Sequence, residues 1–428
     1  MRTRGHDRAL ASVVAMLTGR VPHAILISGP AGIGKTTLAL DLAAGLLCDD
    51  PDPAARPCRA CRGCRLVERG RHPDLHRLAP SGPGDQIRIG SRERPEEGTV
   101  RRLASDLVLL PVEGGARVAI VERADRLTDD AQTALLKTLE EPPPGVTIVL
   151  CADDEDRLLP TVRSRAARIR LGPVATREIE AILAESGVAA EPLAARLARI
   201  SGGRPGAART LARAPDALSA RDEIARSLLD LLTASPATRL AAARDLTTLA
   251  MGMFRALDRA AVEDRSDGAA AAAPGRGRGR SKASAAAIPS SASGASPGDP
   301  AAPTDADDGG STDGDGEEPG AARTAVPAAE RRRAAAVLVG LWRDLARDLL
   351  VVVLGAERQV RDQALLDDLR EAGGGAGSER QLGDFLGRLD AAGELLEANV
   401  RPELVLDSLL LHWPRGTSAA GRAAGTVR

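Results

Sequence analysis

The chain has 428 residues, enough for several domains and far more than a disulfide-stapled miniprotein contains. Its 58 basic and 59 acidic residues give a net charge of -1, which excludes a protein that coats nucleic acid through bulk positive charge. Lysine occurs only at Lys35, Lys137 and Lys282, so a single arginine carries little information in this arginine-rich sequence.

The N-terminus resembles a secretory signal because three arginines precede an apolar run over residues 9–17. No small-residue cleavage site follows, and a phosphate-binding motif begins at Gly29. We therefore expect an amphipathic first helix. The longest later apolar run, residues 349–354, is too short to span a bilayer, and we expect a cytoplasmic protein.

Short apolar runs alternate with helical patterns over residues 1–172, which predicts an α/β domain built on a parallel sheet. Within it, residues 125–141 carry an apolar side chain at every fourth position from Leu127 to Leu139, and prolines from Pro142 onward end this predicted helix. The expected strands are Ala24–Ser28, Arg117–Val121, Val146–Cys151 and Arg168–Leu171.

The rest of the chain is predicted to be helical except for one segment. Residues 173–212 indicate a small helical subdomain, and residues 213–264 and 328–415 carry leucines at helical spacing. Residues 265–327 consist mainly of Ala, Gly, Ser, Pro and Asp and are expected to be disordered, as is the tail 416–428. Arg-Gly repeats in the insertion also permit an RNA-binding interpretation, but a flexible insertion explains its composition better.

A phosphate-binding loop follows the first predicted strand and precedes a helical run. Its residues are Gly29, Pro30, Ala31, Gly32, Ile33, Gly34, Lys35 and Thr36. Backbone amides at the helix N-terminus cradle phosphates, Lys35 neutralises their outer charge, and Thr36, followed by Thr37, lies where Mg²⁺ binds. The loop predicts binding of ATP or ADP with Mg²⁺, but not hydrolysis. A glycine-rich turn without a ligand is the less favoured alternative.

Four of the five cysteines form a cluster with two interlocking C-x-x-C spacings. They are Cys48, Cys58, Cys61 and Cys64. Four thiolates suit tetrahedral Zn²⁺, which predicts a structural zinc module over residues 48–64. A redox pair is the alternative, but neither C-x-x-C begins a helix directly after a strand.

Glu122 and Arg123 follow the predicted strand 117–121, where acidic residues are expected to hold Mg²⁺ and activate water. Glu122 fits the first acidic position, whereas Arg123 fills the second, and a guanidinium cannot act as a general base. Further along, Ser164 and Arg165 end a short segment at the rim of the domain. Arg165 could reach a neighbour's terminal phosphate, although alone it indicates no more than a surface salt bridge.

In this order, these motifs resemble the bacterial clamp-loader family of AAA+ ATPases, and the resemblance covers residues 1–212. Residues 134–143, Ala-Leu-Leu-Lys-Thr-Leu-Glu-Glu-Pro-Pro, belong to the same pattern, and residues 399–404 give a weaker echo of its collar. The resemblance implies an AAA+ domain, a lid over residues 173–212 and a helical collar. It also implies a hetero-oligomeric ring with gamma/tau motor subunits and a delta subunit, which acts on a sliding clamp and primer-template DNA.

Within this family the chain is more similar to a stator-like subunit than to a motor. Arg123 replaces the catalytic acid, Ala152 occupies the polar position at a strand end, and Gly206 aligns with the lid arginine. The resemblance then implies that Ser164 and Arg165 complete an adjacent motor's ATP site and that the chain's own ATPase is weak or absent. The family's cysteine after Ser-Arg is Ala166 here, which changes little because that cysteine packs as a small apolar residue.

Three alternatives remain at this stage. An active motor subunit would hydrolyse ATP on its own. A nucleotide kinase would need base-recognition groups, and the sequence has only two Trp, two Phe and no Tyr. A non-enzymatic zinc scaffold would not bind nucleotide.

Overall fold

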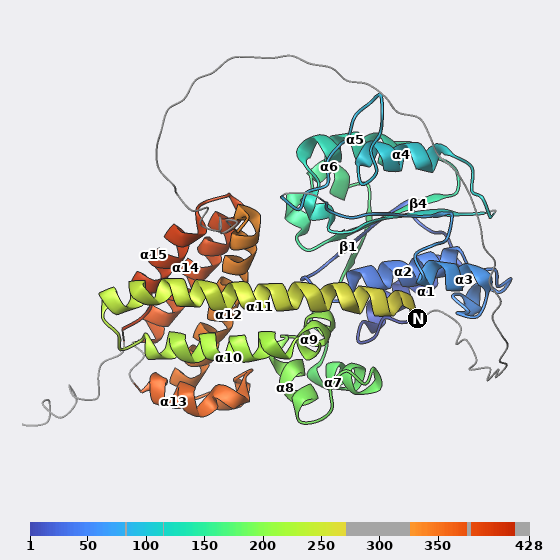
Figure 1. Cartoon of the computed structure of the whole chain (residues 1–428). Coiled ribbons are helices and arrows are strands. Elements are labelled where there is room, and N and C mark those ends of the chain that lie inside the picture. The colour runs from blue at the N-terminus through green and yellow to red at the C-terminus, as the bar shows by residue number, and fades with distance from the viewer. Residues whose placement is uncertain (82–83, 114, 271–325, 375–377, 416–428) are drawn as a thin grey trace, which may run out of the picture. The chain divides into compact units, whose positions relative to one another are not determined.

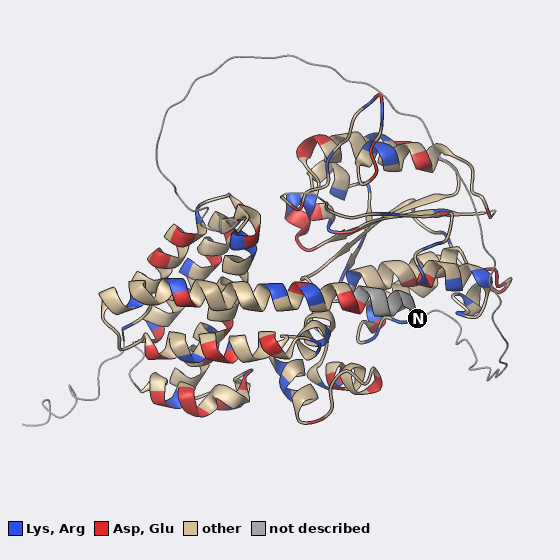
Figure 2. Cartoon of the chain, viewed as in Figure 1, with Lys and Arg blue, Asp and Glu red and all other residues tan. Residues whose placement is uncertain are grey.

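The computed structural model describes residues 1–81, 84–113, 115–270, 326–374 and 378–415 (Figure 1). The expected tail lies outside the described residues, as does most of the expected insertion. Basic and acidic residues are interspersed along the described helices (Figure 2), which agrees with the nearly neutral net charge. None of the helices described combines the length and the apolar character needed to cross a bilayer.

A 5-stranded parallel sheet with the order β2-β3-β4-β1-β5 forms the centre of the first domain. Its strands are β1 Ala24–Ser28, β2 Leu75–Leu78, β3 Arg117–Val121, β4 Val146–Ala152 and β5 Ala167–Arg170. The four predicted strands are present to within one residue at each end. β2 was not predicted, because this edge strand is short and only its two ends are buried.

Helices cover both faces of this sheet (Figure 1), which confirms the predicted α/β class. Alternate strand residues point to opposite faces, so Ile25 and Ile27 pack with α1, α2 and α3, whereas Ala24 and Leu26 pack with α4, α5 and α6. The helices are α1 Asp7–Thr18, α2 Lys35–Leu46, α3 Arg62–Glu68, α4 Val100–Val108, α5 Asp129–Glu140 and α6 Pro160–Arg163, with short 3₁₀ turns η1 Pro53–Ala55, η2 Ala124–Arg126 and η3 Glu155–Arg157.

The helix predicted over residues 125–141 begins later than expected. Residues 124–126 form the separate turn η2, and α5 starts at Asp129. The Thr128 side chain accepts a hydrogen bond from the Ala131 amide and so caps α5 at its N-terminus. The apolar periodicity did not reveal this boundary because Leu127 is buried in the same core as the helix.

Three short helices follow the sheet and share a core of their own. They are α7 Thr176–Glu185, α8 Leu193–Ile200 and α9 Pro205–Ala212. Ile179, Leu183 and Leu197 are among the fully buried residues of this core. These three helices span residues 176–212.

The C-terminal part is helical throughout its described residues. Its elements are α10 Pro215–Asp230, α11 Pro236–Ala270, α12 Ala328–Val353, η4 Glu357–Gln359, η5 Gln363–Leu365, α13 Leu366–Gly373, α14 Glu379–Glu397 and α15 Pro402–His412. Trp342, Phe385 and Trp413 meet in its core with ring centroids 4.8–5.4 Å apart. α11 continues through Ala270, beyond the boundary expected at residue 264.

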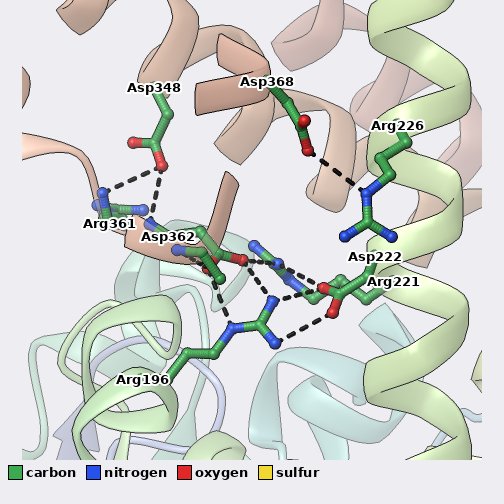
Figure 3. Close-up of polar contacts among 9 residues, drawn as sticks. Arg196, Arg221, Asp222, Arg226, Asp348, Arg361, Asp362 and Asp368 are labelled. Carbon is green, nitrogen blue, oxygen red and sulfur yellow. Dashed lines mark hydrogen bonds and ion pairs between the residues drawn. The ribbon is translucent and has the colours of Figure 1, made fainter. Parts of the chain in front are cut away.

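A cluster of charged side chains joins α8 to the C-terminal helices (Figure 3). Arg196 of α8 donates to Asp222 of α10 at 2.6 and 3.0 Å and to Asp362 at 3.1 Å. The buried Arg221 also donates to Asp362. These contacts satisfy a carboxylate whose side chain is only 2% exposed.

Candidate functional site

The phosphate-binding loop connects β1 to α2, in the strand-loop-helix context that the motif requires. Its glycines adopt positive φ angles that other residues rarely adopt, with values of 150° at Gly29, 77° at Gly32 and 114° at Gly34. The Gly29 amide donates to the Ala152 carbonyl at 3.2 Å, which ties the loop to the end of β4. Thr36 is half-buried and Thr37 is exposed in the first turn of α2.

Lys35 is only 7% exposed, and its ammonium group has three acceptors. It donates to the carbonyls of Gly29 at 2.6 Å and Pro30 at 2.9 Å, and it pairs with the Asp153 carboxylate at 2.5 Å. Asp153 is the first residue after β4. Sequence reasoning missed this residue, although it directly follows a buried strand that pairs with β1.

Both residues that follow β3 are held in ion pairs. Glu122 accepts from Arg77 Nε at 2.8 Å. Arg123 has a φ of 51°, pairs with Asp85 at 2.5 Å, and has its Nε atom 3.8 Å from Asp153. A guanidinium therefore lies at the position predicted for the water-activating carboxylate, and it cannot accept a proton from an attacking water.

Two other positions at which a difference from a motor subunit was predicted, Ala152 and Gly206, both contact the phosphate loop. Ala152 is fully buried at the end of β4 and offers only a methyl group. The Gly206 amide at the start of α9 donates to the Gly32 carbonyl at 2.8 Å. A Cβ atom on Gly206 would lie 3.0 Å from that carbonyl oxygen and 3.2 Å from Gly32 Cα, so a side chain here would require the two backbones to move apart by a few tenths of an ångström.

Arg165 lies just beyond α6, and its side chain is 35% exposed. The guanidinium pairs with Glu140 of α5 at 2.7 Å and donates to the Thr161 carbonyl at 2.9 Å. The Ser164 hydroxyl also donates to that carbonyl, at 3.1 Å. These contacts orient Arg165 while leaving part of it accessible to another molecule.

Gln132 of α5 fixes the segment that leads to Arg165. Its buried side chain accepts from the Leu159 amide at 2.7 Å and donates to the Arg157 carbonyl at 3.1 Å. This second missed residue appears in the sequence only as one polar position in an amphipathic helix. Its partners, 25 and 27 residues further along the chain, become apparent only in the fold.

The four predicted cysteine ligands lie together in the loop and helix that follow α2. Their sulfur atoms are all within 4.8 Å of one another, and those of Cys48 and Cys61 are 3.8 Å apart. Tetrahedral Zn²⁺ with bonds of about 2.3 Å needs sulfurs about 3.8 Å apart. The cluster can therefore hold one metal ion.

Backbone amides point at these sulfurs and favour their thiolate forms. The Cys58, Cys61 and Cys64 amides donate to the sulfurs of Cys48, Cys58 and Cys61 at 3.3–3.5 Å. Amide hydrogen bonds, from Ala60 first and then Cys61, lower the pKa of the Cys58 thiol to about 7. Burial instead raises the pKa of Cys48 and Cys64, so these two groups would become thiolates only beside a positive charge such as that of a bound metal ion.

Comparisons with known proteins find similarity to subunits of DNA polymerase III. Residues 7–175 match the family model described as DNA polymerase III, delta subunit. The Escherichia coli DNA polymerase III subunit delta' is 34% identical over 216 residues, which cover 50% of this chain and 62% of that protein. The predicted clamp-loader resemblance is confirmed. The Pseudomonas aeruginosa subunit delta' is 39% identical over 156 residues, 36% of this chain and 45% of that protein.

DNA polymerase III subunits named tau are also similar to this chain. The Escherichia coli subunit tau is 34% identical over 198 residues, which cover 45% of this chain and 29% of that protein. The matches to the two delta' subunits span less than two thirds of either protein. A DNA polymerase III gamma-subunit-related structure from Thermotoga maritima covers 94% of this chain and 98% of its own, with 17% identity and a TM-score of 0.43.

Proposed function

We propose that this chain is a delta-prime, stator-like subunit of the replicative clamp loader of DNA polymerase III. In this role it binds nucleotide in its own phosphate loop and supplies Arg165 to the ATP site of an adjacent motor subunit. The assembled loader then uses ATP to place a sliding clamp on primed DNA. The chain's own ATPase activity is weak or absent.

One observation carries the distinction from a motor subunit. Arg123 lies where a hydrolytic site needs a carboxylate, and it is paired with Asp85 at 2.5 Å. Ala152 and Gly206 add to this argument, because neither offers a polar side chain to a terminal phosphate. The chain's own site is thus suited to holding a nucleotide rather than to hydrolysing it.

The contacts of Arg165 support its proposed action at the ATP site of an adjacent motor subunit. A guanidinium stabilises the charge that develops on a transferring phosphoryl group. Its contact with Glu140 at 2.7 Å is half-exposed, so a more strongly charged phosphate can replace that partner. Ser164 keeps the backbone turn that presents the guanidinium.

Two cofactors fit the chain's own residues. ATP or ADP would bind at Gly29–Thr37, and Thr36 and Glu122 would hold Mg²⁺, which would neutralise phosphate charge. Zn²⁺ would bind Cys48, Cys58, Cys61 and Cys64 and stabilise the module over residues 48–64. Neither ion is needed for the positioning of Arg165 described above.

The proposed function divides the chain into three domains. Residues 1–172 form the AAA+ domain, residues 173–212 the lid, and residues 213–264 with 328–415 the collar that contacts sister subunits. The proposed ring partners are gamma/tau motor subunits and a delta subunit, and contact with the sliding clamp and primer-template DNA occurs through the complex.

A catalytically active gamma/tau-like motor is the second candidate. The complete phosphate loop favours it, as does the 34% identity to the Escherichia coli subunit tau. Such a motor would need another group to activate water, because Arg123 cannot do so.

The test is Arg165→Ala in a reconstituted loader. We expect hydrolysis at the neighbouring motor's site to fall by at least about 100-fold, because arginine fingers typically contribute more than this. Single-turnover phosphate release with primed DNA measures the effect, and gel filtration checks that the ring still assembles.

Arg163→Ala is the matched control, since Arg163 lies two positions away and pairs only with exposed Asp156 among the contacts described. This variant should hydrolyse ATP at the normal rate. Normal hydrolysis by an assembled Arg165→Ala loader would contradict the trans role.

A further inference from the structure

The carboxylate of Asp153 bridges two cations at the end of β4. Its Oδ1 atom lies 2.5 Å from Lys35 Nζ, and its Oδ2 atom lies 3.8 Å from Arg123 Nε. The backbone of Asp153 is fixed, because its amide donates to the buried carboxylate of Asp125 at 2.8 Å. The end of β4 and this hydrogen bond therefore hold Asp153 beside the phosphate loop.

Lys35 has no donor to spare in this arrangement. An ammonium group has three N–H bonds, and here their acceptors are Gly29, Pro30 and Asp153. Of these acceptors only Asp153 is charged. A nucleotide phosphate brings a second anion to the same ammonium, and two anions that share one cation repel each other.

We propose that Asp153 is a built-in competitor of the nucleotide's outer phosphates for Lys35 and that it keeps the affinity of this phosphate loop low. When nucleotide binds, the carboxylate leaves Lys35 and moves to Arg123, its second cation. Arg123 thus has a further role, which is to hold the displaced carboxylate. The inference rests on the proposed nucleotide binding by this loop.

Competition explains the geometry better than Mg²⁺ binding or base catalysis by Asp153. A metal ligand or general base acts best when its oxygen faces the ion or water rather than a cationic side chain. Here one oxygen contacts an ammonium directly and the other faces a guanidinium. Both contacts favour a role in charge pairing, because they place the carboxylate between two cations.

The experiment measures ATP and ADP binding to the full chain by isothermal titration calorimetry, with Mg²⁺ and with EDTA. Asp153→Asn keeps the shape of the side chain and removes its charge. We expect it to bind both nucleotides at least about tenfold more tightly than the wild type, which corresponds to about 1.4 kcal/mol. The gain should persist in EDTA, because the conflict is with phosphate charge.

Asp154→Asn is the matched control. It makes the same charge change one residue away, on a side chain that is 54% exposed, and asparagine keeps the cap that Asp154 provides to the Asp156 amide. Its affinity should equal that of the wild type. Adding Lys35→Ala to Asp153→Asn should abolish the gain, and thermal melting verifies that each variant is folded.

Three results would overturn the inference. The first is unchanged or weaker nucleotide binding by Asp153→Asn in both conditions. The second is weaker binding by Asp153→Asn only when Mg²⁺ is present, which would indicate a Mg²⁺ ligand. The third is a gain in affinity from Asp154→Asn equal to that from Asp153→Asn. If folded wild type and variants all fail to bind nucleotide, both this inference and the proposed nucleotide binding are wrong. The trans role of Arg165 is measured separately on the neighbour's site and does not depend on that result.

Discussion

Asp362 shows how a buried charge is stabilised between α8 and the C-terminal helices (Figure 3). Burial raises the pKa of this carboxyl group, but the hydrogen bond from Arg196 and the charges of Arg221 and Arg196 lower it more. The net pKa of Asp362 lies below its ordinary value. The carboxylate form thus stabilises the folded chain.

We predict that Asp362→Asn lowers the free energy of unfolding by about 3 kcal/mol, because it leaves Arg196 and Arg221 with too little negative charge. Asp368→Asn is the control, since Asp368 and its partner Arg226 are 43% and 60% exposed. That control should change stability by less than about 1 kcal/mol. Urea denaturation at pH 7 measures both variants, and equal effects would contradict a special role for the buried cluster.

Wild type and Asp362→Asn should also differ in how their stability responds to acid. A carboxyl group with a lowered folded-state pKa stabilises the protein above its unfolded value of about 3.9, and this contribution is lost as the pH falls through the folded pKa. The stability difference between wild type and Asp362→Asn should therefore be constant from about pH 5 to 7 and shrink below about pH 4. A difference that grows on acidification would contradict the lowered pKa.

Residues in local motifs could be predicted from the sequence, whereas residues defined by long-range pairing could not. Lys35 and the four cysteines have neighbours whose spacing reveals their chemistry. Asp153 acquires its role only because β1 and β4 pair in a register that aligns Ser28 with Ala152. Gln132 is a similar case, since its partners lie on a separate turn of the chain.

At the scale of elements, the cysteine module is joined to the phosphate-loop helix. Arg59, within the module, pairs with the buried Asp41 of α2 and with Glu68 of α3 at 3.2 Å. Cys61 lies at the N-cap of α3, and its sulfur accepts from the Cys64 amide. Loss of the metal is therefore expected to loosen α3 and its contact with α2.

We predict about one zinc per purified chain and loss of the metal in Cys64→Ser, because hard hydroxyl oxygen is a poor substitute for thiolate. Elemental analysis measures the metal, and limited proteolysis should then cut the variant between residues 48 and 70. The control is Cys151→Ala, whose cysteine is buried in β4 outside the cluster. A folded wild-type chain without zinc, or a Cys64→Ser chain that retains it, would contradict the zinc site.

Element boundaries depended on how clearly burial appears in the sequence. β1 and β3 are buried at every residue and were predicted at their observed ends from continuous apolar runs. β2 contains His76 and Arg77 between its two leucines, so no apolar run marks it. The start of α5 depended on the cap at Thr128 rather than on periodicity.

For the whole molecule, we propose two separate roles in ATP chemistry. The chain's own site combines an intact phosphate loop with Arg123, Ala152 and Gly206, which we predict to be unsuited to hydrolysis. Arg165, in contrast, is oriented by α5 and remains partly exposed. The fold class could be inferred from the sequence, but the contact of Gly206 with Gly32 became apparent only in the fold.

Steady-state phosphate release by the purified chain alone, with ATP, Mg²⁺ and primed DNA, distinguishes a stator-like subunit from a motor. We expect a rate no higher than that of Lys35→Ala, which lacks the ammonium of the phosphate loop. Sustained turnover that Lys35→Ala abolishes would contradict it and would identify the chain as a motor.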